Sequence, residues 1–96
     1  MASGVPVGDN RKIVTTAATA EQLSTRVQCQ TVCITAETDN TGIIVVGGTT
    51  VVAALATRRG IPLAAGDSVE ISTDSPSNIW IDSTVSGDGV TFTYIN

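Results

Sequence analysis

The stretch QTVCITAETDNTGIIVVGG, residues 30–48, decides the fold of this chain. In its first part the apolar residues Val32, Ile34 and Ala36 alternate with threonine and cysteine, and this period of two predicts a strand with one buried face. TDNTG has the composition of a turn. IIVVGG is apolar on both faces, which predicts a strand that is central in its sheet or covered by a neighbouring subunit.

The same alternation continues towards the C-terminus. DSVEIST, NIWIDSTV and VTFTYI each have an apolar residue at every second position, which predicts three further strands. Their inward positions are Val69, Ile71, Ile79, Ile81, Val90, Phe92 and Tyr94. We interpret VVAALA, residues 51–56, as another strand, SGDG as a hairpin turn, and ATAEQLS as a loop or a single helical turn.

Seven to eight short strands without a long helix predict an all-β protein, specifically a single small β-sandwich or jelly-roll-like domain, with a small barrel as the alternative. MASGVPVGDN, residues 1–10, is rich in glycine and polar residues, so we expect an extended N-terminal arm followed by a sandwich domain over residues 11–96. Aromatic residues are only 3% of the chain. The core is therefore expected to be thin, and association with copies of itself or with a larger partner would stabilise it.

Charge and hydropathy exclude several partners. Five basic residues against nine acidic ones give a net charge of −4, so the basic stripe that nucleic-acid binding requires is missing. No apolar run approaches the roughly 20 residues that span a bilayer, and the start of the chain lacks the basic and apolar regions of a secretory signal. We expect a soluble protein made in a cytoplasm, with no nucleic-acid or membrane partner.

The residues that enzymes use are scarce. The chain has no histidine, the commonest general base and zinc ligand. Asp82 and Asp88 flank the last predicted turn and are candidate paired carboxylates, but aspartate is also ordinary at turns and strand ends. ETDNTG and SGDG carry oxygen ligands without the spacing of a calcium loop, and VGGTT lacks the lysine of a phosphate loop. We expect no catalysis, cofactor or metal.

The two cysteines, Cys29 and Cys33, are four residues apart in a segment that reads as a strand. Four residues of strand span about 13 Å, which is far beyond the reach of a disulfide. We expect both thiols to be reduced and at least one to pack as a small apolar side chain.

The corner TRRGIPLAAGDSVEI, residues 57–71, carries the best candidate contact residues. Because neighbouring strand residues point to opposite faces, at most one of Arg58 and Arg59 can lie against the protein's own surface. The other would project from a rigid bend beside Ile61 and Pro62, where an arginine suits a bidentate contact with a carboxylate. The alternative is an arginine that is solvated or paired within the protein. Trp80 either covers the far side of the sandwich core or anchors an interface.

Three of these segments together resemble small virion proteins of tailed bacteriophages. The resemblance runs through CITAETDNTGIIVVGG, VVAALATRRGIPLAAGDSVEI and NIWIDSTVSGDGVTFTYIN, within residues 32–96. It is a pattern of strands and turns rather than a catalytic signature. It implies a β-sandwich or jelly-roll-like module in the virion, of the capsid cement or decoration type, that binds the outer surface of the shell.

The expected function is therefore non-enzymatic. A cement protein would bridge major capsid subunits on the virion surface as a trimer or dimer, after synthesis in the host cytoplasm. Its expected contact residues are Val5, Pro6, Val7, Arg58, Arg59, Ile61, Pro62 and Trp80. The alternatives are a trimeric tail, baseplate or fibre component, and a carbohydrate-binding β-sandwich module.

Overall fold

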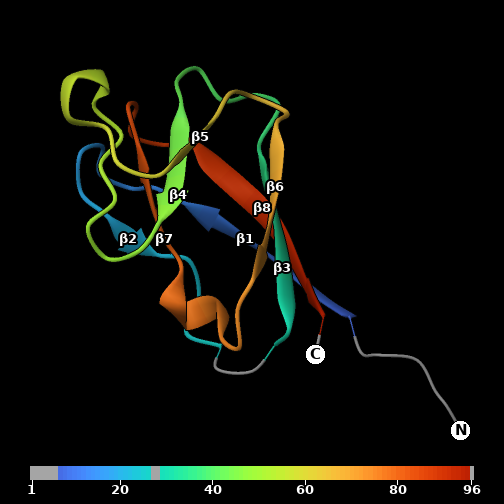
Figure 1. Cartoon of the computed structure of the whole chain (residues 1–96). Helices are drawn as coiled ribbons and strands as arrows, with labels where there is room; N and C mark the ends of the chain where they lie inside the picture. The colour runs from blue at the N-terminus through green and yellow to red at the C-terminus, as the bar shows by residue number, and fades with distance from the viewer. Residues whose placement is uncertain (1–6, 27–28, 96) are drawn as a thin grey trace, which may run out of the picture.

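The computed structural model describes residues 7–26 and 29–95, and this part of the chain is all-β (Figure 1). Its strands are β1 (Val7–Ile13), β2 (Glu21–Gln22), β3 (Thr31–Ala36), β4 (Ile44–Gly47), β5 (Ile61–Leu63), β6 (Ser68–Ser72), β7 (Trp80–Ser83) and β8 (Gly89–Ile95). Two short 3-10 helices, η1 (Leu55–Thr57) and η2 (Pro76–Asn78), lie in the connections. The predicted all-β class is confirmed.

The strands form two four-stranded sheets, which we name sheet A, with the order β1-β8-β3-β6, and sheet B, with the order β2-β7-β4-β5. Every pairing of these strands is antiparallel. The first strand pairs with the last, the second with the seventh, the third with the sixth and the fourth with the fifth. This is the order of a long hairpin rolled up on itself, the jelly roll.

The core lies between the sheets and is built from the alternating positions read from the sequence. In β3, buried and half-buried residues alternate without exception, as predicted for QTVCITAE. Val69, Ile71 and Tyr94 also face inward but remain partly exposed near the margins of the sandwich. The fully buried large side chains of the core include Val32, Ile34, Ile44, Val46, Ile81 and Val90. Branched aliphatic residues thus supply most of the apolar area whose removal from water drives folding.

Strand β1 begins inside the segment predicted as an N-terminal arm. Val7–Asn10 already belong to β1, whose register with β8 runs from Val7 opposite Ile95 to Ile13 opposite Gly89. The ladder hydrogen bonds of these residues outweigh a composition that favours irregular structure. The rest of the predicted arm, residues 1–6, lies outside the described residues.

Two predictions of local structure are wrong. SGDG is not a hairpin turn, because the strands before and after it do not pair with each other. Strand β7 belongs to sheet B and pairs with β2 and β4, whereas β8 belongs to sheet A and pairs with β1 and β3. This connection therefore carries the chain from sheet B to sheet A. VVAALA is not a strand: Val52 makes one isolated bridge, and the chain then enters η1. ATAEQLS contains the two-residue strand β2, which is held by its pairing to β7 rather than by its own propensity.

Candidate functional site

The long connection between β4 and β5, residues 48–60, folds over the outer face of sheet B (Figure 1). Val51 and Ala53 from this connection are buried against Val45 of β4. Ala20, Ile43 and Trp80 pack around them and are partly buried. This second apolar cluster explains why IIVVGG is apolar on both faces: one face meets the core and the other meets loop 48–60 of the same chain.

Loop 48–60 is held in one shape by hydrogen bonds at its base. The backbone N–H of Ala53 donates to the buried carboxylate of Asp82 at 2.9 Å, and the Ala53 carbonyl accepts from Arg58 Nε at 3.0 Å. Val52 and Arg59 exchange two backbone hydrogen bonds, at 3.1 and 3.0 Å. Both polar groups of Ala53 are therefore satisfied, and the two sides of the loop are tied together directly below its tip.

The tip of loop 48–60 presents apolar side chains to solvent. Ala54, Leu55 and Ala56 are all exposed, and Leu55 has 79% of its surface accessible. Ile61, at the start of β5, is 43% exposed. A single exposed leucine is common on protein surfaces. A leucine at the end of a loop that is anchored by buried groups is different, because its position is fixed before any partner arrives.

The two arginines divide as the sequence predicts. Arg58 is half-buried and donates to its own loop, whereas Arg59 is exposed. Within residues 7–26 and 29–95, the Arg59 side chain makes no hydrogen bond or ion pair. Gly60 follows with φ +120°, and a Cβ here would lie 2.6 Å from the Val46 carbonyl oxygen. Only glycine allows the chain to turn so closely against β4.

Most of the predicted contact residues gather at this loop. Arg58 and Arg59 form its base, Ile61 and Pro62 follow in the edge strand β5, and Trp80 packs in the apolar cluster beneath it. The predicted far-side packing of Trp80 is thus partly right: the ring covers the outer face of sheet B. Val7 begins β1 in sheet A, and Val5 and Pro6 lie outside the described residues.

Sequence reasoning missed Leu55. The residues VVAALA have the composition of a strand. Leu55 is exposed only because Val51 and Ala53 pack against Val45 of β4, a contact that the composition does not reveal. One signal was available, namely the length of the connection between the turn formers GGTT and the glycine of TRRG. Connections of this length between strands are uncommon and often carry function.

Asp82 and Asp88, the two residues considered for catalysis, are engaged in structural contacts. Asp82 accepts the N–H groups of Ala53 and Ser83, while the Asp88 carboxylate accepts those of Thr41 and Gly42 at 3.1 and 2.7 Å. The two carboxylates therefore fix different segments. Within the described part of the chain, no three cysteine or acidic residues are arranged to hold a metal ion.

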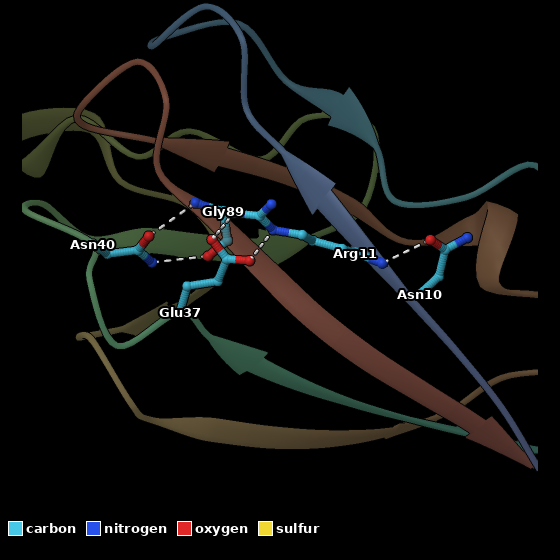
Figure 2. Close-up of polar contacts among 5 residues, drawn as sticks. All are labelled: Asn10, Arg11, Glu37, Asn40 and Gly89. Carbon is cyan, nitrogen blue, oxygen red and sulfur yellow. Dashed lines mark hydrogen bonds and ion pairs between the residues drawn. The ribbon is translucent and has the colours of Figure 1, made fainter.

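The turn after β3 is fixed by polar contacts to β1 and β8. Figure 2 shows Arg11 reaching Glu37, with Nη2 at 2.9 Å from Oε1 and Nε bonded to the other carboxylate oxygen. It also shows the Asn40 amide paired with both backbone groups of Gly89, at 2.8 and 2.9 Å. ETDNTG thus serves as a structural corner.

The two thiols are free, as predicted, and differ in environment. Cys29 is buried in the main core, and its Sγ donates to the Thr73 carbonyl oxygen at 3.0 Å. Burial raises the pKa of this thiol, with a further upward contribution from the charge of Asp74. Cys33 is half-buried on the outer face of sheet A.

No family model, curated protein or solved structure gives a significant match to this chain. In residues 7–26 and 29–95, no helix has both the length and the apolar character needed to cross a bilayer.

Proposed function

We propose that this protein is a non-enzymatic structural protein of a virion, a capsid cement or decoration protein that binds the assembled head of a tailed phage. The observation that carries the proposal is Leu55, 79% exposed at the tip of a loop whose base is anchored by buried Asp82. An apolar side chain that is held in a fixed position is suited to insert into an apolar pocket on the surface of a larger protein. The resemblance of residues 32–96 to small phage virion proteins supplies the kind of partner.

The chemistry of loop 48–60 defines the complementary surface on the major capsid protein. Leu55 requires an apolar pocket on the partner. Arg59 has no hydrogen-bond or ion-pair partner within the described residues, and it suits a carboxylate at the edge of that pocket. Ile61 and Pro62 extend the contact along the edge of sheet B. Val5, Pro6 and Val7 would add a second point of attachment from the N-terminal arm.

Stabilisation of the shell follows from mass action. A protein that binds only the assembled state stabilises it in proportion to its concentration relative to the dissociation constant. One copy that contacts two neighbouring subunits therefore opposes their separation. Association of this protein as a trimer or dimer would multiply the number of bridged subunits.

Binding to shells prepared without this chain tests the contact surface. We expect Leu55→Asp and, separately, Arg59→Glu to abolish or strongly weaken co-sedimentation with shells. Arg59 is chosen alone because Arg58 holds the Ala53 carbonyl, so its replacement would also open the loop. Val85→Asp is the matched control, since Val85 is a 36% exposed valine on a different connection. Unchanged binding of both loop variants would show that loop 48–60 is not the contact.

The copy number in purified particles tests the location. Quantitative mass spectrometry against the major shell protein is expected to give near parity. A few copies per particle would instead indicate the tail, baseplate or fibre role, and absence from particles would end the virion proposal.

A further inference from the structure

The outer face of sheet A carries a groove that the proposed shell contact does not use. Two rows of outward-facing residues cross the sheet in register: Asp9, Thr93, Cys33 and Glu70 in one, and Arg11, Thr91, Thr35 and Ser68 in the other. The central strands β8 and β3 carry short side chains here, whereas the edge strands carry the longer Arg11 in β1 and Glu70 in β6. A shallow cavity of about 460 Å³ lies in this trough.

The cavity continues towards the turn after β3. A second cavity of about 470 Å³ shares Arg11, Thr35 and Thr91 with the first and extends over Glu37 and Asp39. The two together form one elongated groove along the strands. Its size falls within the range of sites for small organic ligands, roughly 300–1,000 Å³.

Several polar groups in the groove are not used by the fold. Within residues 7–26 and 29–95, the carboxylate of Asp9 and the hydroxyls of Thr91 and Thr93 make no hydrogen bond. Asn10 lies opposite Phe92, whose ring faces the core, so its side chain is on the other face of sheet A and adds no donor to the groove. The groove therefore offers a carboxylate acceptor and hydroxyls that both donate and accept.

The charges of the groove select against an anionic ligand. The guanidinium of Arg11 is bound by both oxygens of Glu37, so these two charges offset each other. Asp9, Asp39 and Glu70 remain, and all three are exposed. An anionic polymer such as nucleic acid or an acidic polysaccharide would be repelled, whereas an uncharged ligand rich in hydroxyls matches the mixed donors and acceptors.

We infer that the groove over Asp9, Thr91, Thr93 and Thr35 is a binding site for a neutral oligosaccharide. Sugar hydroxyls would bond to Asp9 and to the hydroxyls of Thr91 and Thr93, while the methyl groups of the threonines contact the apolar faces of the sugar rings. No ring among the described aromatic residues offers an open stacking face here, since Phe92, the one that lines the cavity, is 2% exposed. The expected affinity is accordingly weak, in the millimolar range.

This site and the proposed shell contact are compatible. The groove lies on the outer face of sheet A, and loop 48–60 covers the outer face of sheet B, on opposite sides of the sandwich (Figure 1). A copy bound to a shell through loop 48–60 would present the groove to the surroundings. Sugar binding is measured on the protein alone, so its result does not depend on shell binding.

The test is a titration of the isotope-labelled full chain with the neutral trisaccharides cellotriose, maltotriose and N,N′,N″-triacetylchitotriose, followed by amide chemical shifts. We expect saturable shifts of Asp9, Thr35, Thr91 and Thr93 with at least one of them. Thr91→Val and Thr93→Val remove a hydroxyl at nearly constant shape in strand positions that valine favours. Each is expected to weaken binding about fivefold to tenfold. Thr49→Val, on exposed loop 48–60, is the control and should bind as the unaltered protein does.

Three outcomes would overturn the inference. One is the absence of saturable shifts with every neutral trisaccharide at tens of millimolar. Another is a set of shifts that maps away from sheet A or is unaffected by both threonine variants. The third is preferential binding of a sialylated trisaccharide or of a lysine-rich peptide, which would assign the groove to a charged partner.

Discussion

The carboxylate of Asp82, which is 1% exposed in β7, accepts the backbone N–H of Ala53 at 2.9 Å. This hydrogen bond ties strand β7 of sheet B to loop 48–60, which presents Leu55. Ser83 N–H donates to the other oxygen of the same carboxylate at 2.8 Å. A buried carboxylate that the sequence offers as a catalytic candidate thus sets the shape of loop 48–60.

Loss of this carboxylate should release the loop. Asp82→Ala leaves the Ala53 and Ser83 N–H groups without their acceptor, and we expect a loss of about 1–3 kcal/mol in the free energy of unfolding. The Ala53 amide should also exchange with deuterium faster than amides of β3. Asp39→Ala, which removes an exposed carboxylate, should change stability by less than about 0.5 kcal/mol. Equal effects of the two variants would contradict a role for Asp82 in holding the loop.

Ala18 has a left-handed backbone with φ 66°, the one non-glycine residue of positive φ in the described ranges. An alanine Cβ is strained there, and glycine relieves this strain at the cost of a more flexible unfolded chain. We expect Ala18→Gly to leave stability unchanged or raise it by up to about 1 kcal/mol. Ala17→Gly is the neighbouring control and should lower stability. Denaturant unfolding measures both, and strong destabilisation by Ala18→Gly would refute the assigned strain.

Glu21 should make the protein less stable in acid. Burial alone would raise its pKa, but hydrogen bonds from Lys12, Thr16 and Thr15 together outweigh burial, and its pKa is lowered from 4.5. The unfolded chain then binds the proton more tightly than the folded one. The stabilisation is complete above pH 4.5 and is lost as the pH falls through the lower folded-state pKa.

Glu21→Gln isolates this contribution. The variant removes the titrating group while it keeps an oxygen that can accept from Thr15 or Thr16. We expect its stability to decline less steeply than that of the unaltered protein below pH 4.5, as measured by urea unfolding at a series of pH values. Parallel pH profiles for the two proteins would rule out this source of acid sensitivity.

The two cysteines should differ in their reaction with a thiol reagent. Cys29 is buried, and burial raises its pKa, so little reactive thiolate forms. Cys33 is half-buried on the outer face of sheet A, where the reagent can reach it. We expect one fast and one slow phase with Ellman's reagent, and loss of the fast phase in Cys33→Ser. Persistence of the fast phase in that variant would mean that Cys29 is accessible.

Much of the fold could be predicted from the sequence because burial of one strand face requires apolar residues at every second position. The period of two in residues 31–36 and 90–95 marked the inward faces correctly, since the side chains of a strand alternate between core and solvent. The double-sided apolar character of residues 43–46 also indicated a covered strand. The covering segment was beyond prediction, because Val51 and Ala53 meet Val45 only after the chain has turned back.

The sequence by itself determined the all-β class, the inward faces of β3, β6, β7 and β8, the free thiols, and that at most one of Arg58 and Arg59 lies against the protein's own surface. These follow from alternation, strand geometry and charge, which act within a few residues. Only the tertiary structure decided the jelly-roll order, the crossing of SGDG between sheets, the anchoring of Ala53 by Asp82 and the exposure of Leu55. Each of these depends on contacts between residues distant in the chain, whose free energies are set by packing and hydrogen bonding in three dimensions and leave no periodic signal.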